Sequence, residues 1–299
     1  MDAHLAASVT YALRSGPFNI RLEAGDPAFR KLFESLYKNA TDVSVGDVGP
    51  IYHYAIRLNV PSFLRRYFRP QIELTVDGLR PFEPYPRKHA FPLFEWGLNW
   101  ILAMTAHQYL MLHSAVLERN GIACIFPALP GSGKSTLCAA LAHHGWRLLS
   151  DEFGLVDYQT MQILPMPRPI GLKNQSIEII REYLPQAFIG PNFYNTRKGT
   201  VAHVAPPSDS IAQQHVTARP ALIVFPRYSP EHGCRLKSIS KSLAFTRLSN
   251  NAFNYKVSME NGFRALGHLI QTCDAYSLEY HSFEQAINSL NELCDERSH

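Results

Sequence analysis

Residues 128–136 read ALPGSGKST and combine glycines, a lysine and hydroxyl side chains at a spacing suited to phosphate binding. The glycines let backbone N–H groups turn inward around phosphate oxygens, because no Cβ stands in the way. Lys134 adds a point charge and Ser135 a hydroxyl ligand for Mg²⁺, as in the P-loop pattern G-x-x-x-x-G-K-S/T, although Ala128 replaces its first glycine. The nucleotide-binding residues predicted from this match are Pro130, Gly131, Ser132, Gly133, Lys134, Ser135 and Thr136.

Two adjacent acids, Asp151 and Glu152, close the apolar segment RLLSDE at 147–152. In phosphoryl transfer one carboxylate can hold Mg²⁺ while another orients and deprotonates the acceptor hydroxyl. Neighbouring residues of a regular strand point to opposite faces, so both acids can serve one site only where the strand ends or twists. We therefore expect Mg²⁺ at Ser135 and Asp151 and a catalytic base at Glu152 or Asp151. One functional acid beside a solvated neighbour is the alternative.

The segments on either side of the glycine loop have the character that phosphate binding requires. The run GIACIFPA at 121–128 is short and apolar, which is typical of a buried strand. The run STLCAALAHHG at 135–145 places apolar residues on one helical face and ends in glycine. A strand, a glycine loop and a helix in this order direct the positive end of the helix toward a bound anion. We therefore expect ATP to bind here.

The chain is expected to fold as two units, an N-terminal α+β domain at 1–90 and a P-loop domain at 91–299. In the first unit, Asp26 before a proline predicts a helix N-cap. The alternation of apolar and polar residues predicts the strands. No motif in this unit indicates its role. Its expected elements are strands at 11–24, 51–60 and 71–82, a helix at 26–40, and a proline-rich linker at 80–92.

The second unit begins with the apolar run at 91–112, which predicts a buried helix followed by a strand. Polar residues such as Glu95 interrupt this run, so a membrane span is not expected. Asn120-Gly121 predicts a hairpin turn between the segments 109–119 and 121–128. The later expected elements are a helix at 174–184, a loop at 185–200, a strand at 221–228, and a strand and helix within 277–294.

The order of these elements resembles the catalytic core of the bacterial HPr kinase/phosphorylase family. The resemblance rests on His113 in LHSAVLERNGIACIFPALPGSGKST, on the helix that follows, and on GWRLLSDE, which is similar to the family segment G-h-R-L-V-A-D-D. Phosphoenolpyruvate carboxykinase shares this P-loop core more distantly. The segments PRPIGLKNQSIEIIREY (167–183) and FPRY (225–228) extend the resemblance to HPr kinase-related proteins found beside peptide-modification genes.

The resemblance implies an α/β fold with a P-loop kinase core, in which a mixed central sheet has flanking helices. It implies that Asp151 and Glu152 match the family's acid pair, whose second member is the base, and that His113 lies near the phosphates. A buried structural role is the alternative for this histidine. The family signature E-x-R-G-L-G-I-I-N-V has NTRKGTVAHV (195–204) as its nearest counterpart, which lacks the metal-binding glutamate. The expected catalytic residues are Asp151, Glu152, His113 and Lys134.

Five further basic residues are candidates to neutralise the charge of a transferred phosphoryl group. A surface or structural cation is the alternative for each of them. They are Arg168 and Lys173 after the acid pair, Arg197 and Lys198 on the expected loop, and Arg227 at the end of a buried strand.

Charge and cysteine content exclude several classes of function. The net charge of +4 is mild and spread along the chain, and nucleic-acid binding is not expected. The most basic cluster, RRYFRP at 65–70, indicates a solvated loop face or, alternatively, part of a surface for an acidic partner. The five cysteines are scattered and form no C-x-x-C pair, which argues against a disulfide framework or a zinc site. The first residues lack the charged start and apolar block of a signal peptide. We expect a cytoplasmic protein without membrane attachment.

Together these features predict an ATP- and Mg²⁺-dependent kinase that phosphorylates a serine hydroxyl of a peptide or small protein. An unactivated serine hydroxyl is a poor nucleophile, so a positioned carboxylate distinguishes a kinase from a nucleotide-binding protein. Two alternatives stay open: a kinase for a small molecule such as serine or a sugar, and a non-catalytic ATP-binding partner of a peptide-maturation complex. The resemblance is also compatible with a homo-oligomer.

Overall fold

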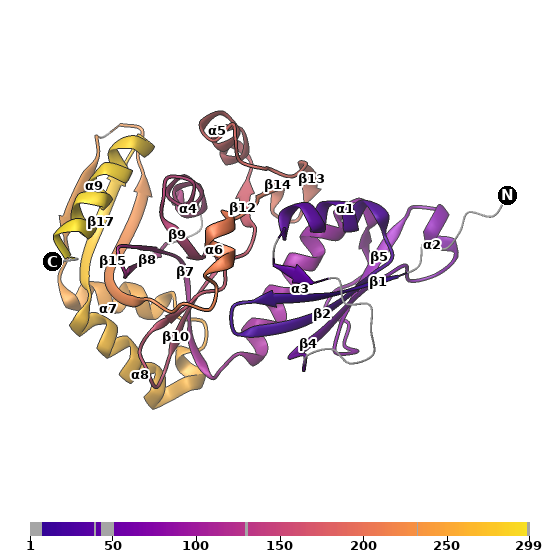
Figure 1. Cartoon of the computed structure of the whole chain (residues 1–299), viewed down its shortest axis with the longest axis horizontal. Coiled ribbons are helices and arrows are strands. Elements are labelled where there is room, and N and C mark those ends of the chain that lie inside the picture. The colour runs from indigo at the N-terminus through magenta and orange to yellow at the C-terminus, as the bar shows by residue number, and fades with distance from the viewer. Residues whose placement is uncertain (1–7, 39, 43–50, 129–130, 232, 298–299) are drawn as a thin grey trace.

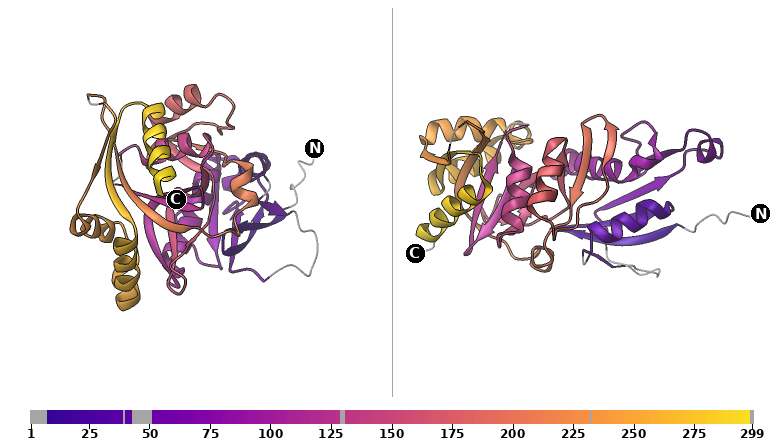
Figure 2. Two further views of the ribbon diagram at one scale, coloured as in Figure 1. Left: turned by 60° about the vertical axis from the view of Figure 1, so that its left-hand side comes forward. Right: turned by 90° about the horizontal axis from the view of Figure 1, so that it is seen from above.

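Two large β-sheets with their helices follow one another along the long axis of the molecule (Figure 1). The computed structural model describes residues 8–38, 40–42, 51–128, 131–231 and 233–297. The N-terminal strands lie at one end of the molecule and the last helix, α9 (Phe283–Arg297), lies at the other (Figure 2). The fold is a mixed α/β arrangement, as the sequence predicted at this level.

The N-terminal part of the chain forms a six-stranded sheet. Its strands in spatial order are β3 (Thr41–Asp42), β1 (Val9–Ser15), β2 (Phe18–Ala24), β4 (Tyr54–Asn59), β5 (Gln71–Val76) and β6 (Tyr85–Pro86), and α2 (Leu64–Tyr67) precedes β5. Every second residue of β2 is buried, as alternation predicts. Helix α1 (Pro27–Leu36) begins after Asp26, whose Oδ1 accepts a hydrogen bond from the Phe29 N–H at 2.8 Å. The predicted N-cap is thereby confirmed.

Helix α3 (Ala90–Thr105) packs against this first sheet, whereas the sequence places it at the start of the expected unit 91–299. An added Cβ at Gly97 would lie only 2.6 Å from the Leu74 side chain of β5, so this side chain packs directly against the helix backbone. The helix is apolar on most sides, so its hydrophobic pattern does not indicate which face packs against which sheet. The expected linker at 80–92 contains β6 and a 3₁₀ turn (Arg87–His89) that leads into α3.

The rest of the chain is built on an eight-stranded sheet. Its strands in spatial order are β11 (Ile163–Leu164), β10 (Phe153–Asp157), β7 (Tyr109–Arg119), β8 (Ile122–Pro127), β15 (Arg219–Tyr228), β17 (Asp274–Tyr280) and β16 (Arg235–Ser238), while β9 (Arg147–Ser150) also pairs with β7. Strands β8, β15 and β17 are parallel, whereas β7 and β8 form an antiparallel hairpin. Asn120 and Gly121 form its turn with positive φ, which confirms the predicted hairpin.

Helices cover both faces of the second sheet. They are α4 (Lys134–Ala142), α5 (Gln175–Tyr183) and α9 on one face, and α7 (Lys241–Asn250) and α8 (Tyr255–Thr272) on the other. On β8, Phe126 packs into the first of these clusters and Ile125 into the second, so this strand is buried on both sides. None of the helices in the described part of the chain combines the length and apolarity needed to cross a membrane.

A small third sheet lies between the two larger ones (Figure 1). Its strands in spatial order are β12 (Ile170–Lys173), β14 (Gly199–Val204) and β13 (Phe193–Thr196), and α6 (Ser208–Ala212) follows. The prediction of a loop at 185–200 is therefore wrong in part, because β13 and the start of β14 form a hairpin there. A turn with positive φ at Gly199 accompanies this hairpin, whose polar sequence obscured the strand pattern.

Candidate active site

The predicted P-loop follows β8, at the edge where the three parallel strands end. Tyr228 at the end of β15 donates its N–H to the Ser132 carbonyl at 3.0 Å, and the Tyr280 hydroxyl at the end of β17 donates to the Gly133 carbonyl at 3.2 Å. The described part of the loop is thus fixed by strands that are distant in sequence. Crevices at such strand ends are the usual ligand sites of open α/β sheets. Pro130, another predicted contact, lies outside the described residues.

The loop conformation explains its glycines. Gly131 and Gly133 have φ values of +85° and +91°, where a side chain would be strained. At Gly133 an added Cβ would also lie 2.7 Å from the Tyr280 hydroxyl. Helix α4 starts directly afterwards, so Ser135 and Thr136 lie in its first turn. Unpaired N–H groups and the helix dipole make this turn suitable for binding an anion.

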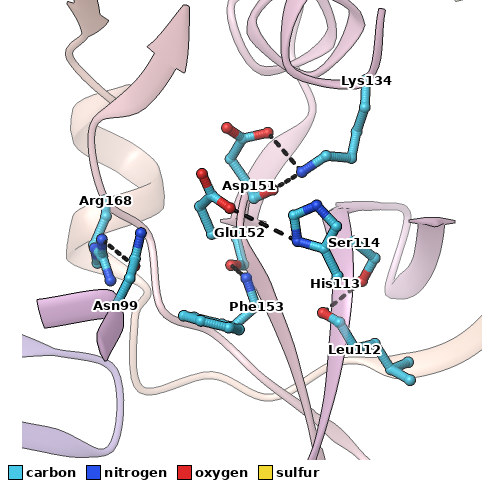
Figure 3. A network of polar contacts seen from close by, with 10 residues as sticks. Asn99, Leu112, His113, Ser114, Lys134, Asp151, Glu152, Phe153 and Arg168 are labelled. Atoms are coloured by element: carbon cyan, nitrogen blue, oxygen red, sulfur yellow. Dashed lines mark hydrogen bonds and ion pairs between the residues drawn. The ribbon is translucent and has the colours of Figure 1, made fainter. Parts of the chain in front are cut away.

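The lysine of the predicted P-loop contacts the first acid of the predicted pair. Lys134 Nζ donates a hydrogen bond to the Asp151 backbone carbonyl and lies 3.6 Å from Asp151 Oδ1 (Figure 3). The Asp151 side chain is only 4% exposed, yet neither carboxylate oxygen accepts a hydrogen bond from the residues that the structure describes. Its lone pairs therefore remain available to a metal ion, and carboxylate oxygens are ligands that Mg²⁺ prefers.

Both acids serve one region because the strand ends before them. Asp151 and Glu152 form the bend between β9 and β10, where two adjacent side chains are no longer held on opposite faces of a strand. Asp151 points toward Lys134, whereas Glu152 points toward His113 (Figure 3). Both acids line one cavity, which we call the polar cavity.

His113 lies on β7, and its Nδ1 is 3.7 Å from Glu152 Oε2. Burial lowers the pKa of His113, and the Lys134 charge lowers it further, against the opposing effect of the acids. The imidazole is therefore mainly neutral at pH 7. The backbone N–H of His113 donates to the Asn251 carbonyl at 2.6 Å. The imidazole ring lies edge-on to the Phe253 ring, with centroids 5.5 Å apart.

The electrostatic surroundings keep Glu152 ionised. Burial alone would raise the pKa of this carboxyl group, but Lys134, His113, Lys198 and Lys173 act in the opposite direction. The net effect holds the pKa of Glu152 below its ordinary value of 4.5. At neutral pH this side chain is a carboxylate that can accept a proton.

Helix α3 holds Arg168 in place. Arg168 Nη2 donates to Glu95 Oε2 and Asn99 Oδ1, each at 2.7 Å. Glu95 also accepts a hydrogen bond from the Tyr37 hydroxyl at 2.5 Å. Burial disfavours the guanidinium charge, but Glu95 and Tyr37 raise the pKa of Arg168 above its ordinary value. This network was not predicted from the sequence, although an acid inside an apolar helix is itself a signal, since buried acids are almost always paired.

The polar cavity brings three of the five predicted basic residues next to the acids. Arg168, Lys173 and Lys198 line it together with Asp151 and Glu152. Arg168 Nε and Nη1 are buried and have no hydrogen-bond partner within the described ranges. Donors and cations arranged around an acid pair suit a site where phosphoryl charge develops.

The two remaining basic candidates lie farther out. The Arg197 guanidinium lies over the Tyr85 ring, 5.6 Å from its centroid. The Arg227 side chain is 76% exposed, lies 4.0 Å from Glu279, and lines neither cavity beside the acid pair. The structure thus brings Arg197 to the rim of the site and leaves Arg227 outside it.

A second cavity, which we call the apolar groove, adjoins the polar cavity. The two cavities share Trp96, Asn99, Glu152 and Lys198 in their linings. The groove encloses about 440 Å³, a size typical of small-ligand sites. Its walls are mainly aromatic and include Phe82, Tyr85, Trp96, Trp100, Phe153 and Phe253. Glu152 therefore stands between a compartment lined by charged side chains of both signs and a mainly aromatic one.

Comparisons with known proteins assign no family to this chain, since no protein-family model and no curated protein matches it. Within the described ranges, no group of three or more His, Cys, Asp or Glu residues is placed to hold a metal ion. A P-loop Mg²⁺ site does not need such a group, because one hydroxyl, one carboxylate, phosphate oxygens and water complete its coordination. A function for this chain must therefore be inferred from the geometry of the two cavities.

Proposed function

We propose that this chain is a kinase that transfers the γ-phosphoryl group of ATP to a serine hydroxyl of a peptide or small protein. We also propose that its core is of the HPr kinase and phosphoenolpyruvate carboxykinase type. The main support is the arrangement in which Lys134 contacts Asp151 while Glu152, the next residue, lies between two cavities. A phosphate loop alone would support nucleotide binding. The ionised carboxylate beside it adds a proton acceptor for a hydroxyl group.

The loop and the first turn of α4 would hold the nucleotide. The backbone N–H groups around Gly131 and Gly133 would donate to phosphate oxygens, and Lys134 would balance the β/γ charge. Ser135 and Asp151 would hold Mg²⁺, since the Asp151 oxygens accept no hydrogen bond within the described part of the chain. When bound, this ion supplies charge neutralisation at the phosphate oxygens.

Glu152 would act as the base. The serine oxygen attacks the γ-phosphorus while the bond between that phosphorus and the ADP oxygen breaks, and Glu152 takes the hydroxyl proton. A carboxylate of low pKa is a weak base, which suits a loose transition state where the nucleophile is little bonded. His113, 3.7 Å away, would restrict the orientation of this carboxylate. Arg168, Lys173 and Lys198 would balance the charge of the transferred group.

Labelling with ATP radioactive at its γ-phosphate tests this function. The wild-type protein, with Mg²⁺ and a library of serine-containing peptides, should label serine. Lys134→Ala should lower the labelling rate by about 100-fold or more, because the phosphate charge loses its cation. Lys237→Ala, which removes an exposed lysine on β16, is the matched control. Labelling that Lys134→Ala leaves unchanged would contradict the proposal.

A further inference from the structure

We infer that the apolar groove binds the acceptor, and that this acceptor is a peptide with an aromatic side chain and an acidic side chain flanking its serine. This inference rests on the proposed kinase function and specifies its substrate class. It follows from what lies on the two sides of Glu152: charged side chains line the polar cavity, whereas the walls of the apolar groove are mainly aromatic.

One face of α3 forms a wall of the groove. Trp96, Trp100 and Ala103 recur at intervals of four and three residues, so they lie on the same side of the helix. Phe253 lies on another side of the groove and also contacts the His113 ring. Aromatic walls gain free energy by removing apolar surface of a ligand from water. Pairs of aromatic rings gain free energy beyond this burial, so the occupant of this groove carries an aromatic side chain.

The position of Glu152 indicates which residue of the acceptor supplies this side chain. Glu152 lines both cavities, so a serine with its hydroxyl at this carboxylate has its flanking residues next to the groove. Adjacent residues of a peptide are separated by about 3.8 Å between Cα atoms, so a flanking side chain reaches the aromatic wall. Free serine has no such side chain. The hydroxyl groups of a sugar would find few hydrogen-bond partners on aromatic walls.

The charges at the rim select the other flanking residue. Arg197 lies over the Tyr85 ring, and Lys198 lies over the Trp96 ring with Nζ 5.8 Å from its centroid. Glu152 is the one acid in the groove lining that the structure describes, and it is occupied by the serine hydroxyl in the proposed reaction. Lys198 also lines the polar cavity, whereas Arg197 lines the groove alone. A carboxylate on the acceptor complements Arg197, which favours an acidic residue beside the serine.

Calorimetric titration of three peptides tests the groove without requiring transfer. The probes are acetyl-Gly-Phe-Ser-Glu-Gly-amide, its analogue with alanine in place of phenylalanine, and its analogue with lysine in place of glutamate. They are titrated into the full chain with a non-hydrolysable ATP analogue and Mg²⁺. The phenylalanine peptide should bind about tenfold or more tightly than the alanine peptide. It should bind about two- to fivefold more tightly than the lysine analogue.

Two variants that alter the groove in opposite ways keep the test independent of folding defects. Trp100→Ala removes part of the wall and Ala103→Phe fills the space, and each should abolish the preference for phenylalanine over alanine. Phe263→Ala removes an aromatic residue that is 60% exposed on α8 and absent from the described groove lining, and it should keep the preference. Equal binding of the phenylalanine and alanine peptides to the wild type would overturn the inference. So would free serine binding as tightly as the phenylalanine peptide.

Label transfer to the same peptides separates the two proposals. Transfer at equal kcat/KM to the phenylalanine and alanine peptides would overturn the groove assignment and leave the kinase function intact. Selective binding without transfer would contradict the kinase function and leave the groove as a peptide-binding site.

Discussion

His113 Nδ1 and Glu152 Oε2 lie 3.7 Å apart because β7 and β10 pair in one register. Phe153, which follows Glu152, is the partner of His113 across these antiparallel strands. A slip of one residue would turn the side chains of β10 to the opposite face. The pairing of two strands thus sets the distance between the candidate base and the histidine beside it.

The first prediction concerns this histidine. Lys134→Ala should raise the pKa of His113, because a nearby positive charge makes protonation of the imidazole less favourable. Titration of the His113 ring by NMR measures the change, with Lys237→Ala as the control. An unchanged or lowered pKa would show that the lysine charge does not act on this ring.

The second prediction concerns the pH dependence of phosphoryl transfer. Glu152 must be ionised to accept a proton, and its pKa lies below 4.5, so kcat should fall only as the pH drops below that value. Brief assays after a pH jump, made before any unfolding, give the profile. An acid limb close to pH 6.5 would instead point to a group that titrates like an ordinary histidine.

The third prediction concerns the buried pair of Arg168 and Glu95. Arg168→Met should lower the free energy of unfolding by about 3–5 kcal/mol, because it leaves a buried carboxylate without its cation. The double variant Arg168→Met with Glu95→Leu should regain most of this loss. Urea denaturation measures both, and Arg227→Ala, at an exposed pair, should change stability by less than about 0.5 kcal/mol. A double variant no more stable than Arg168→Met would contradict the account of this pair.

The fourth prediction concerns acid stability and His203. Burial lowers the pKa of His203 to about 4 from 6.5, so the unfolded chain binds a proton more readily than the folded one between these values. The free energy of unfolding should therefore fall as the pH drops from 6.5 to about 4, by about 3 kcal/mol in all. Below pH 4 His203 should cause no further loss. His203→Gln should flatten this slope in urea denaturation. A slope identical to that of the wild type would assign the acid sensitivity to other groups.

The sequence predicted the local elements of the site well. Asn120-Gly121 fixed the hairpin before the loop, and the apolar segment ending at Asp151 placed both acids at the end of a strand. These features depend on residues close together in the chain, where turn chemistry and hydrophobic periodicity act directly.

The contacts between distant segments were not predictable in this way. Arg168 was a candidate for the phosphoryl group, and its partners Glu95 and Asn99 lie on a helix 73 and 69 residues earlier in the chain. The aromatic face of α3 reads as ordinary core in the sequence, and it becomes a groove wall only when the β13–β14 hairpin lies opposite. Pairing between segments so far apart depends on the whole fold.

The most direct test of the central claim is the effect of Glu152→Gln on phosphoryl transfer to a serine peptide. This variant keeps the size of the side chain and removes the proton acceptor, so kcat should fall by about 10²–10⁴-fold while ATP affinity stays near that of the wild type. Glu260→Gln, at an exposed glutamate on α8, is the matched control and should retain full activity. A Glu152→Gln variant that transfers phosphate at the wild-type rate would contradict the account.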